Sequence, residues 1–135
     1  MKKIMAGVAV AIFVAGAALA GSPAQAAKPG ECIAGGGQNH LCKYMPLMRD
    51  LPGGGRETFI VGTDEAIWTR WVDGGSNAWS DWHSFGGVSR SEVFIESHWE
   101  GNKFVSVITH LGTDGNPYSR KRPDLGQSWT GWYRS

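Results

Sequence analysis

Short runs of alternating apolar and polar residues, separated by glycine-rich turns, fill most of the chain after residue 40. No segment shows the sustained helical spacing of apolar residues. Turn signals recur roughly every 8–12 residues, which is typical of an all-β fold. A weaker candidate strand covers Leu41–Met48, where Pro46 favours an edge or a strand end. The main predicted strands are Glu57–Val61, Ala66–Val72, Trp79–Phe85, Val93–Trp99, Lys103–Leu111, Asn116–Lys121 and Trp129–Tyr133.

The stretch Gly62–Trp82 occurs twice, because a shift of fifty residues places Gly112–Trp132 beneath it without a gap. Six of these positions are identical in the two copies. A fixed period of this length is characteristic of repeat architectures such as propellers and solenoids. The shift pairs Trp68 with Tyr118, Arg70 with Arg120, Trp79 with Trp129, and Trp82 with Trp132.

The repeat also predicts the grouping of the strands. Shifting Val93–Trp99 back by fifty residues lands on 43–49, with Tyr44 beneath Phe94. Each repeat would then supply four strands, two before the Gly-Thr-Asp turn and two after it. We therefore expect residues 41–135 to form a domain of about two four-stranded antiparallel units.

Two linked motifs carry a family resemblance. The first is Gly-Thr-Asp-x-x-x-Trp/Tyr-x-Arg, and the second is Trp79-Ser80-x-Trp82-x-Ser84-x-Gly86-Gly87-Val88. Together they resemble the blade repeat of bacterial PLL-like β-propeller lectins, which are fucose-type sugar binders related to tectonin-like propellers. The resemblance covers residues 57–135 and implies four-stranded blades with shallow sugar sites. The second copy departs from it at Pro117, Lys121 and Gly131.

The aromatic residues of the repeat are the candidate ligand contacts. Indole faces can stack on pyranose rings, while arginine bonds hydroxyl groups. Residues two apart share a strand face, so Trp68 lies with Arg70 and Tyr118 with Arg120. Each pair suits either a cation–π stack between blades or a sugar platform. The four remaining repeat tryptophans, interpreted as blade core or pocket wall, are Trp79, Trp82, Trp129 and Trp132.

A closed propeller usually has four to eight blades, and this chain has about two. Each blade buries a face against its neighbour, so two blades alone would expose tryptophan-rich faces. We therefore expect a homo-oligomer of two to four chains that completes the ring. The alternative is a two-sheet sandwich monomer, or a chain trimmed from a longer ancestor.

The N-terminal residues predict export. Lys2-Lys3, the apolar run Ile4–Ala20 and the Ala24-Gln25-Ala26 site are typical of a signal peptide over residues 1–26. Export allows disulfides, so Cys32 and Cys42 are expected to pair and to tether a glycine-rich segment over residues 27–40 as a tail.

Composition and motifs exclude several function classes. The acidic and basic residues nearly balance, so no general field attracts nucleic acid or membranes. We expect no metal, no cofactor and no catalytic residue, because zinc spacing, phosphate loops and a facing carboxylate pair are all missing from the sequence. The prediction is a secreted, non-enzymatic, lectin-like protein. The alternatives are a secreted protein-interaction or inhibitor module and, less favoured, a hydrolase.

Overall fold

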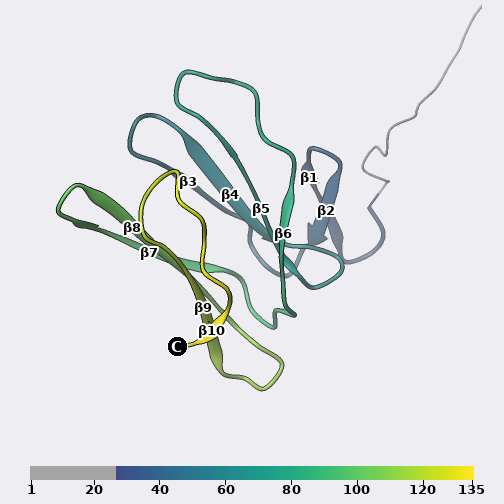
Figure 1. Cartoon of the computed structure of the whole chain (residues 1–135). Coiled ribbons are helices and arrows are strands. Elements are labelled where there is room, and N and C mark those ends of the chain that lie inside the picture. The colour runs from purple at the N-terminus through teal and green to yellow at the C-terminus, as the bar shows by residue number, and fades with distance from the viewer. Residues whose placement is uncertain (1–26) are drawn as a thin grey trace, which may run out of the picture.

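The computed structural model describes residues 27–135, so the predicted signal peptide lies outside the described residues. Residues 27–135 form ten β-strands and no helix, and they contain no helix that could cross a membrane. The prediction of an all-β, antiparallel fold is confirmed. Figure 1 shows one small hairpin and two larger sheets.

The first sheet has the strand order β3-β4-β5-β6. Its strands are β3 (Leu47–Asp50), β4 (Arg56–Val61), β5 (Ile67–Val72) and β6 (His83–Gly86). Strand β4 is buried from Glu57 onward, because it is a central strand covered on both faces.

The second sheet repeats this arrangement with the order β10-β9-β8-β7. Its strands are β7 (Phe94–Glu100), β8 (Lys103–Leu111), β9 (Pro117–Arg122) and β10 (Tyr133–Arg134). Chain order within each sheet is therefore the one that the fifty-residue shift predicts. Strand β3 begins directly after Pro46, so this proline lies next to a strand end, as expected.

The fourth strand of each predicted repeat is shorter than expected. Trp79 and Trp82 precede β6, and Trp129 and Trp132 precede β10, so all four lie in connecting segments. A side-chain hydroxyl group explains the late start of this strand in both copies. The backbone N–H of Trp71 donates to Ser80 Oγ at 3.0 Å, and that of Lys121 donates to Thr130 Oγ1 at 3.0 Å. A side chain thus takes the place of a ladder carbonyl and delays regular pairing.

The glycine-rich N-terminal segment is a hairpin and not a tail. Strands β1 (Glu31–Gly35) and β2 (Gln38–Leu41) pair with each other, and we call them the N-terminal hairpin. The predicted disulfide between Cys32 and Cys42 is confirmed, with 5.1 Å between the Cα atoms. The predicted strand Leu41–Met48 is divided, because β2 ends at Leu41 and β3 starts at Leu47.

The hydrophobic core lies between the two large sheets. Its fully buried members are Phe59, Val61 and Ile67 from the first sheet, with Val93 and Ile108 from the second half of the chain. Trp129 and Trp132 pack against this cluster, so the interpretation of these two as core residues is supported.

The Gly-Thr-Asp turns have the same hydrogen bonds in both copies. Gly62 and Ala66 bond through N–H and C=O at 2.8 Å, as do Gly112 and Asn116 at 2.9 Å. The fourth residue of each turn has a left-handed backbone: Glu65 has φ of 70° and Gly115 has φ of 79°. Glu65 alone pays a steric cost there, because it has a Cβ atom.

This difference predicts unequal effects of one substitution at equivalent positions. Gly115→Ala should lower the free energy of unfolding by about 1 kcal/mol, since alanine must adopt positive φ. Glu65→Ala keeps the strain that is already present and removes only an exposed ion pair with Arg90, so about 0.5 kcal/mol or less is expected. Urea denaturation of both variants measures this, and equal losses would contradict it.

Candidate functional site

The aromatic residues Trp68 and Tyr118 are held by the turn that precedes them. Trp68 Nε1 donates to Asp64 Oδ1 at 3.0 Å, and Tyr118 Oη donates to Asp114 Oδ2 at 2.7 Å. The hydrogen bond from Tyr118, followed by that from the Asn116 amide, lowers the pKa of Asp114 to about 2. The same contact raises the pKa of Tyr118. Each ring is therefore fixed in orientation by its own turn.

The two repeat arginines do not stack on their neighbours along the strand. Arg70 lies over Trp79 at 5.0 Å and over Trp82 at 4.9 Å. Arg120 lies over Phe85 at 4.4 Å and over Trp132 at 5.5 Å. Burial lowers the pKa of Arg120 from its ordinary value. The cation–π partners come from the connecting segment and from the neighbouring sheet, which strand periodicity alone does not show.

A cleft of about 630 Å³ opens between the first sheet and the segment 122–129 of the second. At its side Trp71 stacks on His83, with 5.0 Å between ring centroids and 24° between planes. Trp71 lies on strand β5, and its large apolar side chain is 38% exposed. The polar and charged residues that line the cleft include Glu57, Thr69, Asp73, His83, Ser84, Arg120, Arg122, Gln127 and Ser128.

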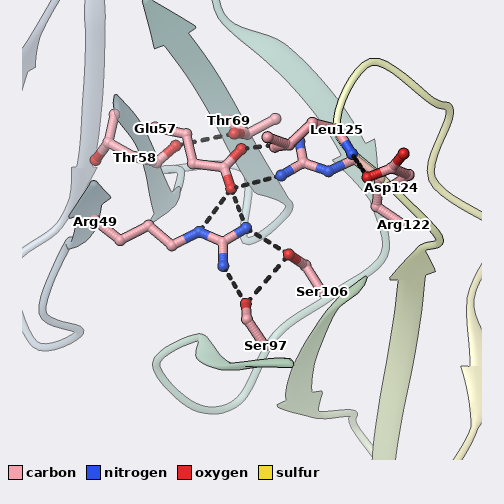
Figure 2. Close-up of polar contacts among 9 residues, drawn as sticks. All are labelled: Arg49, Glu57, Thr58, Thr69, Ser97, Ser106, Arg122, Asp124 and Leu125. Carbon is pink, nitrogen blue, oxygen red and sulfur yellow. Dashed lines mark hydrogen bonds and ion pairs between the residues drawn. The ribbon is translucent and has the colours of Figure 1, made fainter. Parts of the chain in front are cut away.

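The floor of the cleft is a buried ionic cluster centred on Glu57, which is 1% exposed (Figure 2). Arg122 donates to both carboxylate oxygens, each at 3.1 Å. Arg49 donates through Nε to Oε1 at 2.7 Å and also through Nη2. Arg49 reaches Ser97 and Ser106 of the second sheet as well, the latter at 2.8 Å. The cluster thus joins β3 and β4 to β7, β8 and β9.

Partial desolvation accompanies this pairing. Burial lowers the pKa of Arg49, and the charge of Glu57 opposes that effect. The guanidinium of Arg122 also lies over the Trp129 ring at 4.8 Å. Trp129 therefore contributes both to the core and to the cleft wall.

A smaller hollow of about 270 Å³ lies beside the Gly-Thr-Asp turn of the second repeat. Tyr118 and Trp132 line it together with Gly87, Val88 and His110. His110 is in edge contact with Trp132, 4.6 Å between centroids, and burial lowers the pKa of His110.

The structure thus separates the eight predicted ligand residues into four places. Arg120 and Trp129 line the large cleft, and Tyr118 and Trp132 line the smaller hollow. Arg70, Trp79 and Trp82 form a stack beside the N-terminal hairpin, while Trp68 lies on its turn.

Sequence reasoning missed Trp71, His83, Glu57 and Arg122 as site residues. The position fifty residues after Trp71 is Lys121, so the repeat does not indicate a role for Trp71. Its strand face, shared with the buried Ile67 and Thr69, predicts burial, so the exposure of Trp71 is visible only in the structure.

Comparison with known protein families found no matching family model, and comparison with curated proteins found no significant match. Within residues 27–135, no group of three or more His, Cys, Asp and Glu side chains is arranged to hold a metal ion.

The ionic cluster predicts a large cost for removing its single acid. Glu57→Gln leaves two buried guanidinium groups without a counter-charge, and we expect a loss of about 3–5 kcal/mol in the free energy of unfolding. Glu65→Gln, which breaks the exposed pair with Arg90, is the matched control and should cost under about 1 kcal/mol. Denaturant titration distinguishes the two, and a small loss for Glu57→Gln would contradict a structural role for the cluster.

The lowered pKa of Asp114 predicts acid sensitivity. A carboxyl group with a depressed pKa in the folded state contributes stability above its ordinary pKa, near 4, and loses it as pH falls toward 2. Asp114→Asn does not titrate, so its stability should fall less steeply than that of the native chain in this window. Thermal unfolding at several pH values measures the slopes, and parallel slopes would contradict the assignment.

Proposed function

We propose that the chain is a secreted, non-enzymatic carbohydrate-binding protein whose principal site is the cleft beside Trp71. The observation that carries this proposal is the Trp71–His83 stack, which presents an exposed indole at the side of an open cleft. An exposed aromatic supported from behind is a rigid platform for the apolar face of a sugar ring.

The polar groups around that platform support the same conclusion. Asp73 and Gln127 offer acceptors for sugar hydroxyl groups, and Ser84 and Arg120 offer donors. The volume of about 630 Å³ lies within the range of small-molecule sites. Because Glu57 anchors Arg122 from below, the floor of the cleft is fixed before a ligand enters.

The resemblance to PLL-like lectins adds the expectation of a fucose-type ligand. On this proposal the two four-stranded sheets act as propeller-type blades, and further copies would complete a ring when the surfaces at the two ends of the chain are uncovered. The smaller hollow beside Tyr118 and Trp132 is then a second, weaker sugar site. Several weak sites on one assembly would increase the overall affinity through multivalency.

The cleft gives little support to a hydrolase. Glu57 and Asp73 are the carboxylic residues that line it. Both oxygens of Glu57 accept hydrogen bonds from arginines, so this group is committed to the ionic cluster. A glycosidase needs two carboxyl groups that are free to exchange protons or attack the sugar.

The disulfide between Cys32 and Cys42 is consistent with an oxidising compartment and so supports the proposal of secretion.

A protein-interaction module remains the second candidate, on a separate observation. Edge strand β7 carries two large exposed apolar side chains, Phe94 and Trp99, and neither lines a hollow described above. An exposed apolar strand edge is a typical protein-binding surface.

A glycan array with three tryptophan variants tests the lectin proposal. Trp71→Ala should abolish the glycan binding that free sugar competes away. It should lower the free energy of unfolding by no more than about 1 kcal/mol, because the Trp71 side chain is partly exposed. Trp99→Ala is the matched control and should bind normally. Trp68→Ala tests whether the first repeat aromatic also contacts sugar. Absence of any glycan signal, together with capture of a protein that Trp99→Ala fails to capture, would favour the second candidate.

A further inference from the structure

One contact between neighbouring elements occurs twice in the fold. Trp132, directly before β10, donates through Nε1 to the carbonyl of Phe85, next to the end of β6, at 2.8 Å. Trp82, directly before β6, donates through Nε1 to the carbonyl of Gly35, the end of β1, at 2.9 Å. Donors and acceptors are each fifty residues apart.

The arginines follow the same rule. Arg120 donates through Nη1 to the carbonyl of Phe85 at 3.3 Å and stacks over its ring. Arg70 lies against Gly35 and Gly36, so closely that a Cβ atom on Gly36 would collide with Nη1 and lie 2.9 Å from Trp82 Nε1. Arg70 is therefore covered by the N-terminal hairpin as Arg120 is covered by β6.

The backbone completes the correspondence. His40 forms a bridge with Gly62, and Arg90 donates its N–H to the carbonyl of Leu111 at 2.8 Å, beside Gly112. His40 and Arg90 are again fifty residues apart, as are Gly62 and Gly112. The hairpin thus contacts the first sheet at positions fifty residues before those that join the end of the first sheet to the second, and it shares the tryptophan-to-carbonyl bond.

We infer that the N-terminal hairpin is a cap that occupies a self-association surface, formed by Arg70, Trp79 and Trp82, whose alternative occupant is strand β10 of a second copy. Repeat proteins commonly cover a terminal interface with a shortened unit. The occupant follows from the series Gly35, Phe85 and Ser135, which are fifty residues apart. Ser135 follows β10 and is exposed, and β10 pairs with β9 as β6 pairs with β5.

The contact is heterologous, because one copy offers β10 and the other offers the arginine stack. Such contacts build rings or open chains when neither surface is covered. The disulfide closes the hairpin between Cys32 and Cys42 and keeps the cap formed. The oxidised chain is therefore monomeric, and displacement of the cap allows head-to-tail assembly.

The test is a full-length variant in which the cap is displaced. Gly36→Val places a side chain against Arg70 and Trp82 at a residue with φ of 62°. Gly30→Val is the matched control, since Gly30 also has positive φ, 84°, but has no atom within 4 Å of an added Cβ. In light scattering after size-exclusion chromatography, Gly36→Val should show an average mass at least about twofold that of the monomer, rising with concentration. Gly30→Val should stay monomeric.

Two further substitutions identify the occupant. Position 135 in the second copy should face Arg70, as Phe85 faces Arg120. Adding Ser135→Phe to Gly36→Val should strengthen association, and adding Ser135→Arg should abolish it, because two guanidinium groups would meet. A folded Gly36→Val variant that remains monomeric would overturn the proposal. So would association of Gly36→Val that is unchanged by adding Ser135→Phe or Ser135→Arg.

A second route avoids the glycine substitution if that variant does not fold. Cys32→Ser with Cys42→Ser opens the covalent closure of the cap and keeps every contact residue. This double variant should associate with increasing concentration, and adding Ser135→Arg should return it to the monomer. A monomer at every concentration for the double variant would equally overturn the proposal.

Discussion

The buried ion cluster around Glu57 fixes how the two sheets meet. Its acid comes from the first sheet, one arginine comes from each sheet, and two serine hydroxyl groups come from the second. Charges in an interior are costly unless each has a partner, so the cluster tolerates few relative positions of the sheets. The apolar core of Phe59, Ile67 and Ile108 stabilises the contact, but it would accept small shifts that the hydrogen bonds do not.

The candidate site inherits its shape from this constraint. Arg122 bonds Glu57 on one side and lies over Trp129 on the other, so the cleft wall and floor are fixed together. Trp71 and His83 face this wall from the first sheet. A site formed from two sheets keeps its geometry only if their relative position is unique. The ionic cluster supplies that uniqueness where Glu57 and Arg122 line the cleft.

The sequence predicted what local chemistry and repetition determine. Strand alternation and the fifty-residue period gave the all-β class and the grouping of strands, and the two cysteines gave the disulfide. The cluster was not predictable this way, because Val107, fifty residues after Glu57, carries no charge. Pairs such as Glu57 and Arg122, sixty-five residues apart, leave no periodic signal. The strands at β6 and β10 were predicted too long, because Ser80 and Thr130 compete with the backbone for hydrogen bonds.

The repeated tryptophan-to-carbonyl contact has a consequence for how such chains can change in length. Its acceptor is a main-chain oxygen, which every residue type provides, while its donor and the adjoining arginine belong to the repeated motif. Each unit therefore recognises its predecessor without demanding a particular side chain from it. A gene segment encoding fifty residues could be gained or lost as one piece, and the new junction would already be chemically compatible.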